Sequence, residues 1–306
     1  MMRNYTTQMD AARRGIITPE MKAVAKKEYR IEELRELVAQ GKVVICANRF
    51  HTCIDPNGVG SMLRTKINVN LGMSRDCKDY DIKMEKVMSA VNMGAEAIMD
   101  LSSHGNTRPF RRKLTAEYLA MIGTVPVYDS VIHYERDLAT LTARDFIDVV
   151  RLHAEDGGDF VTLHCGITRK TIEQIRNHKR KMNIVSRGGF LVFAWMSITG
   201  EENPFYEYFD DILEICREYD VTISLGDACR SGCLADGSDV CQIEELVRLG
   251  ELTKRALRKG CTGYGERSRT SAHGSDCNQY ETAAYYLHGG AFLRTRPDPY
   301  RHCARI

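Results

Sequence analysis

The chain has 306 residues, of which 43% are hydrophobic, enough apolar material for one large domain or two small ones. Its 43 basic and 41 acidic residues are spread along the chain and leave a net charge of +2, which speaks against a nucleic-acid-binding or membrane-binding surface. No apolar run reaches the length of a membrane span, and the N-terminus has no hydrophobic signal core, so we predict a cytoplasmic protein. The 11 cysteines are scattered, which in the cytosol indicates buried thiols rather than disulfides.

Residues 1–42 are polar and helix-forming, with a turn before Pro19. Beyond them, short β-type runs that end in polar residues or glycine alternate with helical patterns, at roughly 30 residues or a little more per unit. The predicted strands are residues 66–70, 97–101, 124–128, 160–164, 184–187 and 221–226.

Apolar residues between these runs recur with the spacing of one helix face, and Thr142 is a candidate N-cap. The stripes are formed by Met84, Val87, Met88, Val91, Phe146, Val149, Val150, His153, Phe209, Ile212, Leu213, Cys216, Ile243, Leu246 and Val247. Alternating strands and helices predict an α/β fold with a parallel sheet. Six units without a glycine-rich dinucleotide-binding turn favour an incomplete TIM-type β/α barrel, with about six of eight strands, over a doubly wound sheet.

The pattern predicts three segments: an N-terminal helical segment at 1–60, a partial barrel at 61–260, and a segment at 261–306 in which neither the helical nor the strand period continues. Active sites of such barrels lie at the carboxyl ends of the strands. The candidate residues at those ends are Asn70, Met99, Asp100, Tyr128, His164, Ser186, Arg187, Gly188, Gly189, Asp227 and Arg230.

This set suits a phosphorylated ligand rich in hydroxyl groups. Arg187 and Arg230 can each bind phosphate oxygens in a forked geometry, and Gly188 lets backbone N–H groups approach a phosphate. His164 and Tyr128 can carry or relay protons. Each residue also has a structural interpretation: a hydrogen-bonded histidine, an Asp227–Arg230 ion pair, a simple turn at 186–189. Six consecutive strands with polar ends favour a barrel enzyme acting on a small phosphorylated substrate.

Cys229, Cys233 and Cys241 match no zinc or iron–sulfur spacing, and we interpret them as incidental. A phosphosugar isomerase or aldolase barrel is the alternative at this level. No lysine stands at a predicted strand end to form a Schiff base, which counts against the aldolase.

Eight longer motifs resemble, in order, those of the thiamine-pyrimidine synthase family, also called the ThiC or phosphomethylpyrimidine synthase family, over about residues 4–260. These motifs lie at residues 7–21, 66–72, 94–102, 122–128, 183–189, 202–207, 224–227 and 249–253.

The resemblance implies a radical S-adenosylmethionine lyase that converts aminoimidazole ribotide to hydroxymethylpyrimidine phosphate in thiamine biosynthesis. It implies S-adenosylmethionine, a [4Fe-4S] cluster and a divalent metal, zinc, as cofactors, and a homodimer. By matching motif, the family's substrate contacts fall on Asn70, Met99, Tyr128, His164, Ser186, Arg187, Gly188, Asp227 and Arg230.

Some positions depart from the family pattern. Phe190 stands where a small serine is usual and is expected to add bulk beside the phosphate, and Ser231, Cys165 and Phe50 are further departures. A related enzyme, hydroxybenzimidazole synthase of cobamide biosynthesis, uses the same ribotide, and these motifs do not separate the two.

Residues 261–306 lack the family's two metal-binding histidines and its Cys-x-x-Cys-x4-Cys cluster motif. In a shifted reading frame, codons from Arg267 can spell Gly-Pro-Gly-His, and those from Ala291 can spell Pro-Phe-Tyr-Val-Leu-Gly-Pro, in family order. We therefore expect a frameshift near codon 261 and interpret Glu266 as accidental. If the shift is in the gene, the expected product is non-catalytic and binds neither cluster nor metal; if it is only in the sequence record, the expected protein is an ordinary member of the family.

Overall fold

The computed structural model describes residues 3–178, 180–265 and 291–292. Its strands are β1 (Val43–Ile45), β2 (Gly58–Gly60), β3 (Asn68–Leu71), β4 (Ala97–Asp100), β5 (Met121–Thr124), β6 (Phe160–Leu163), β7 (Thr222–Leu225), β8 (Gly263–Gly265) and β9 (Ala291–Phe292). β1 and β2 pair antiparallel as a separate two-stranded sheet.

The main sheet has the order β3-β4-β5-β6-β7-β8-β9, so that neighbours in space are neighbours in sequence, and every pair is parallel. This is the order of a TIM-type barrel, not of a doubly wound sheet. β4 to β7 are buried along their whole length, as expected of parallel strands covered on both faces. The predicted fold class is confirmed, with β3 and β9 at the two ends of an unclosed sheet.

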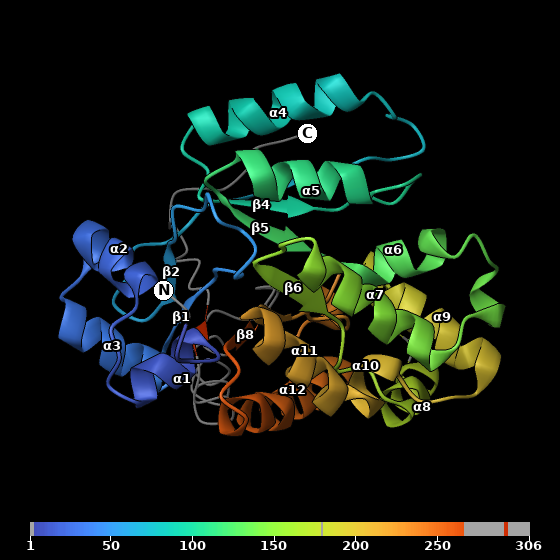
Figure 1. Ribbon diagram of the computed structural model, residues 1–306. Helices are drawn as coiled ribbons and strands as arrows, with labels where there is room; N and C mark the ends of the chain where they lie inside the picture. The colour runs from blue at the N-terminus through green and yellow to red at the C-terminus, as the bar shows by residue number, and fades with distance from the viewer. Residues whose placement is uncertain (1–2, 179, 266–290, 293–306) are drawn as a thin grey trace.

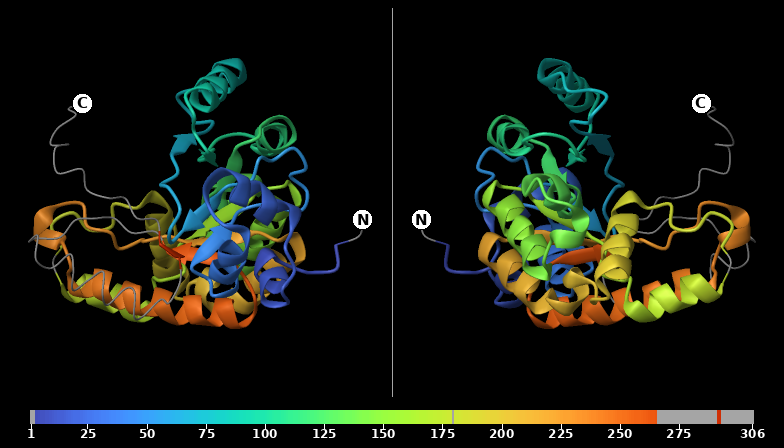
Figure 2. Two further views of the ribbon diagram at one scale, coloured as in Figure 1. Left: turned by 90° about the vertical axis from the view of Figure 1, so that its left-hand side faces the viewer. Right: turned by 90° about the vertical axis from the view of Figure 1, so that its right-hand side faces the viewer.

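Helices surround this sheet. They are α1 (Gln8–Arg13), α2 (Pro19–Glu28), α3 (Ile31–Ala39), α4 (Tyr80–Asn92), α5 (Arg108–Glu117), α6 (Pro126–His133), α7 (Ala143–Glu155), α8 (Arg169–Asn177), α9 (Arg187–Thr199), α10 (Pro204–Glu207), α11 (Phe209–Tyr219) and α12 (Val240–Arg258), with 3-10 turns at Leu138–Thr140 and Leu234–Asp236. Figure 1 shows α1, α2 and α3 grouped beside the barrel, and Figure 2 shows α4 and α12 at opposite ends of the molecule.

The predicted helical stripes become α4, α7, α11 and α12. Thr142 begins α7 as predicted, with a reciprocal capping box to Asp145. The N-terminal helices have a core of their own, in which Met21, Leu34 and Val38 are fully buried. The division into segments at 60 and 260 remains a prediction.

Two predicted strands are wrong in place or in kind. The predicted run 124–128 is mostly helix, because Pro126 cannot donate to a strand ladder and instead occupies the first turn of α6; the strand itself ends at Thr124. The predicted run 184–187 contains no strand. Ser186 caps α9 by accepting the N–H of Gly189, and β6 pairs directly with β7, which leaves no place for a strand between them.

β8 was not predicted. It lies at the start of the segment 261–306 and pairs with β7. It places the ring of Tyr264 against that of Phe160 in a tilted arrangement, with ring centroids 6.1 Å apart. Most of the segment to which the frameshift expectation applies, Glu266 included, lies outside the described residues.

Candidate functional site

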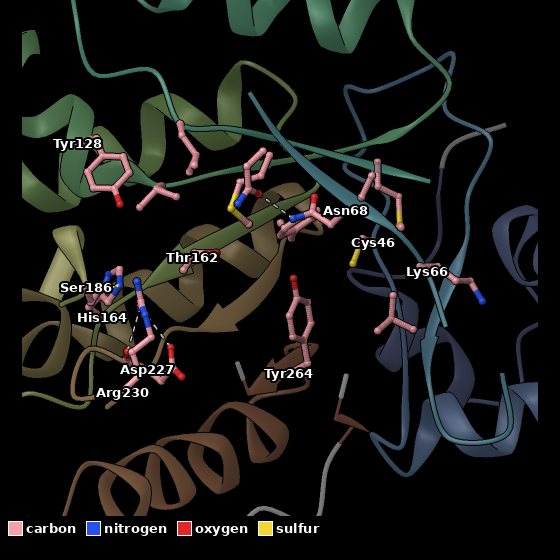
Figure 3. A pocket seen from close by; sticks show the side chains of 18 residues that line it. Cys46, Lys66, Asn68, Tyr128, Thr162, His164, Ser186, Asp227, Arg230 and Tyr264 are labelled. Carbon is pink, nitrogen blue, oxygen red and sulfur yellow. Dashed lines mark hydrogen bonds and ion pairs between the residues drawn. The ribbon is translucent and has the colours of Figure 1, made fainter. Parts of the chain in front are cut away.

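A cavity of about 490 Å³ lies at the centre of the sheet (Figure 3). Seven of the nine residues predicted to bind substrate line it, and they come from six separate stretches of chain. They are Asn70, Met99, Tyr128, His164, Ser186, Asp227 and Arg230. The fold therefore brings together most of the predicted set.

The first wall of the cavity is formed by β3 and β4, in which Asn70 is the register partner of Met99. Residues two apart on a strand point to the same side, so Asn68 lies on the same face as Asn70, and its amide donates to the Asn70 side-chain oxygen at 3.2 Å. Both asparagines line the cavity. This wall supplies amide donors and acceptors that suit ring nitrogens or hydroxyl groups.

The opposite end of the cavity is built around His164, which follows β6 and is 4% exposed. Its Nε2 lies 3.0 Å from the Ser186 hydroxyl, and its Nδ1 has no hydrogen-bond partner among the described residues. Burial, helped by the positive charge of Arg230, lowers the pKa of His164 to about 3. The ring is therefore neutral at physiological pH and acts as a hydrogen-bonding group rather than as a cation.

The N-terminus of α9 faces the same end. Its first backbone N–H groups have no acceptor within the helix, and they carry the positive end of the helix dipole. A Cβ on Gly188 would lie 2.4 Å from the His164 ring, and a Cβ on Gly189 would lie 2.6 Å from that of Ala228. The two glycines thus let the helix terminus approach both His164 and the loop that carries Asp227 and Arg230.

Arg187 and Gly188 are the two predicted residues that are not part of the cavity wall. The guanidinium of Arg187 stacks over the ring of Tyr128, 5.0 Å from its centroid, and so lies beside the cavity. Tyr128 itself stands on α6 and not at a strand end as predicted, because the preceding Pro126 has already started the helix.

Asp227 and Arg230 form the ion pair that the structural interpretation predicted, with Nη1 and Oδ1 3.4 Å apart. Both residues also line the cavity, and the Arg230 side chain keeps 34% of its surface exposed. The pair is loose enough in geometry that Arg230 can turn a charged edge toward a ligand.

Phe190 does not narrow the site as predicted. Its side chain is 54% exposed on α9 and is not part of the cavity wall.

The sequence patterns missed several lining residues, among them Cys46, Lys66, Asn68, Thr162 and Tyr264. The alternation along 66–70 could have found Asn68. Lys66 precedes β3 at its amino end, and its ammonium group is held by Glu28 at 2.5 Å and by the carbonyl of Arg64 at 2.9 Å. It lies at the opposite end of the cavity from His164 (Figure 3).

These features define a β/α-barrel protein whose central cavity has an anion-attracting end, formed by Arg230 and the α9 N-terminus, and an amide-lined wall. Residues 7–264 match the model of the Radical SAM ThiC family, and the chain belongs to that family.

Curated relatives agree with this assignment. The chain is 59% identical over 256 residues to a phosphomethylpyrimidine synthase of Alkaliphilus oremlandii, covering 83% of this chain and 59% of the relative. It is 59% identical over 257 residues to the enzyme of the same name from Clostridium novyi, covering 84% and 59%. The chain thus spans about three fifths of the length of these curated relatives.

Among solved structures, a dihydropteroate synthase from Stenotrophomonas maltophilia aligns with 75% of this chain and 86% of its own, at 11% identity and a TM-score of 0.33. A likeness at that score adds nothing to the assignment.

The family name implies S-adenosylmethionine and an iron–sulfur cluster. Iron and zinc bind the thiolate form of cysteine. Within the described ranges, no three His, Cys, Asp or Glu side chains converge on a possible metal position. Burial raises the pKa of the thiols of Cys46 and Cys261 to about 12 and that of Cys241 to about 11. The described cysteines therefore do not fit a cluster or a metal ion. That the whole chain binds neither cluster nor metal remains a prediction.

In residues 3–178 and 180–265, no helix is both long enough and apolar enough to cross a lipid bilayer.

Proposed function

We propose that the central cavity is the substrate site of a phosphomethylpyrimidine synthase and that it binds aminoimidazole ribotide. The single observation that carries the proposal is the meeting of Arg230, the α9 N-terminus and neutral His164 at one end of a cavity whose other wall presents amides. A ribotide has a phosphate at one end and a nitrogen heterocycle at the other, and this polarity matches that of the cavity.

At the phosphate end, the backbone N–H groups of Arg187 and Gly188 and the guanidinium of Arg230 bind phosphate oxygens. Ser186 already accepts from Gly189, and its hydroxyl proton and the His164 ring are left to bond a ligand oxygen or each other. At the other end, Asn70 and Met99 contact the heterocycle, and Asp227 and Tyr128 bond the ribose hydroxyls between the two.

The chemistry that S-adenosylmethionine and a reduced cluster supply when bound is the generation of a radical. The part proposed for the described residues is to bind the ribotide, to orient its ribose, and to hold neutral His164 against it. Zinc and the homodimer are further expectations that follow from the resemblance, and a cytoplasmic location is proposed as well. A hydroxybenzimidazole synthase is the alternative activity, since it begins from the same ribotide, and product analysis separates the two.

The test is a calorimetric titration of the full chain with aminoimidazole ribotide and with the corresponding riboside, which lacks the phosphate. We expect the ribotide to bind about 100-fold more tightly, because two charge-assisted contacts to phosphate contribute about 1.5–3 kcal/mol each before desolvation is counted. Equal affinities for the two ligands would contradict the proposal.

Two arginine variants test whether the difference in affinity between the ribotide and the riboside depends on Arg230. Arg230→Ala is expected to weaken ribotide binding by at least about tenfold and to leave riboside binding nearly unchanged. Arg144→Ala removes a cation from the surface of α7, where it pairs with Asp148 and Asp211, and is the matched control with no expected effect on either ligand.

A further inference from the structure

Behind the cavity, a buried carboxylate contacts the loop that carries Asp227 and Arg230. Glu245 lies on α12 and is 2% exposed. One carboxylate oxygen accepts the N–H of Ala228 at 2.9 Å, and the other accepts the N–H of Cys229 at 2.7 Å. Both oxygens of one side chain are thus used on two consecutive amides of a single loop.

A buried cation contacts the same loop from the other side. Arg180 lies between α8 and α9 and is 7% exposed. It donates to the carbonyl of Cys229 at 2.8 Å and to the carbonyl of Asn183 at 2.8 Å, and its Nε lies 2.7 Å from a carboxylate oxygen of Asp239, the N-cap of α12. The peptide groups on either side of Cys229 are therefore held by two buried side chains, the carboxyl group of Glu245 and the guanidinium of Arg180.

Close packing leaves Glu245 little freedom. A Cβ on Gly166, in the segment after β6, would lie 2.5 Å from the Glu245 Cγ, so the absence of a side chain there makes the room that the carboxylate occupies. On the far side of the loop, Gly189 packs on Ala228, with space for no Cβ between them. The loop is thus enclosed by α12, the segment after β6, and the α9 N-terminus.

We propose that Glu245 and Arg180 are positioning residues that hold the loop backbone so that Arg230 and the α9 N-terminus together form one anion-binding end of the cavity. This inference rests on the proposed function. The residues touch no ligand themselves; they act through Ala228 and Cys229, which lie two residues and one residue before Arg230.

An apolar side chain in place of Glu245 would fill the same space but could not fix the direction of the two backbone N–H groups. Backbone N–H groups bonded to a carboxylate form charge-assisted hydrogen bonds, which are shorter and stronger than neutral ones, and removing one partner leaves a buried group unsatisfied. Burial raises the pKa of Glu245 to about 8, against the opposing effect of the Cys229 amide. The binding test is therefore run at pH 9, where the carboxyl group is ionised.

The variant is Glu245→Gln, which keeps the volume but places an NH2 group where one of the two amides needs an acceptor. We expect ribotide affinity to fall at least about tenfold while riboside affinity changes less than about twofold, because only the phosphate contacts depend on the loop. Glu244→Gln is the control one residue earlier on α12, where the carboxylate pairs with Lys170 and Arg248, and is expected to change neither affinity.

An equal loss for both ligands in Glu245→Gln would show a merely structural role and overturn the proposal, as would unchanged affinities in a folded variant. If Glu245→Gln does not fold, hydrogen exchange of the wild-type chain tests the proposal instead. The amides of Ala228 and Cys229 are expected to be protected, and rapid exchange at both would overturn the proposal. A wild-type chain that does not prefer the ribotide would contradict the proposed function instead. Hydrogen exchange at the amides of Ala228 and Cys229 would still test whether Glu245 and Arg180 hold the loop.

Discussion

Gly188 lies so close to His164 that a Cβ on residue 188 would stand 2.4 Å from the imidazole Cε1 and 2.7 Å from its Nδ1. The contact joins the first turn of α9 to the segment after β6 and fixes the distance between the helix N-terminus and the ring. It explains why a residue without a side chain is needed at this end of the cavity.

Gly188→Ala is therefore expected to displace the His164 ring and weaken ribotide binding by about tenfold or more, since misplacement of a contacting group by 1 Å can cost about 100-fold in function. Stability is expected to change less, because alanine is the better helix former by roughly 1 kcal/mol and offsets part of the clash. Titration calorimetry and denaturant unfolding measure the two effects.

Ser197→Ala, on the exposed face of the same helix, is the control and is expected to bind the ribotide like the wild type. Wild-type affinity in Gly188→Ala would show that the ring has room to move and that the contact is not needed.

We expect His153 to make the stability of the protein depend on acid pH. Its Nε2 lies 3.0 Å from an Asp129 carboxylate oxygen, and burial, with Arg111 acting in the same direction, lowers its pKa to about 4. An unfolded chain protonates this histidine near pH 6.5. The stability contributed by the neutral ring is therefore complete above about pH 6.5 and is lost as the pH falls toward 4, by up to about 1.4 kcal/mol per pH unit.

Replacing His153 by glutamine removes this titration and keeps a donor for Asp129. We expect the free energy of unfolding of the wild type to fall more steeply than that of His153→Gln between pH 6.5 and 4.5. His178→Gln, at an exposed histidine after α8, is expected to follow the wild type. Parallel curves for wild type and His153→Gln would contradict the assignment.

Asn203 holds His164 from the backbone side. The side chain is completely buried, its amide donates to the carbonyls of His164 and Ile167 at 2.8 Å each, and its oxygen caps α10 by accepting the N–H of Phe205 at 3.0 Å. Asn203→Ala leaves two carbonyls and one N–H without these partners. We expect a loss of about 2–4 kcal/mol in the free energy of unfolding.

Asn203→Asp keeps the shape of the side chain but turns an acceptor toward two carbonyls, so it is expected to be at least as destabilising as alanine. Glu201→Ala, an exposed neighbour, is the control. A stable Asn203→Asp protein would show that packing, not hydrogen bonding, is what the site needs. Denaturant unfolding of the four proteins measures all of these values.

The local patterns of the sequence were sufficient to predict α4, α7, α11 and α12, whose apolar stripes bury one face. They also predicted β3, β4, β6 and β7, whose short β-type runs end in polar residues. They also found the site residues that directly follow a strand, such as His164 and Asp227, because the carboxyl ends of parallel strands meet at one edge whatever the loops do. Where capping chemistry competed with a β-type run, as at Ser186 and Pro126, the strand prediction was wrong.

By itself, therefore, the sequence determined the class of fold, the order of the strands, the family and seven of the residues around the cavity, since each is encoded within a stretch of a few residues. Only the tertiary structure decided that Gly188 meets His164, that Asn203 holds the His164 carbonyl, and that Glu245 and Arg180 enclose the Cys229 backbone. These contacts join residues 16 to 49 positions apart, and no local period records which distant backbone group a buried side chain will reach.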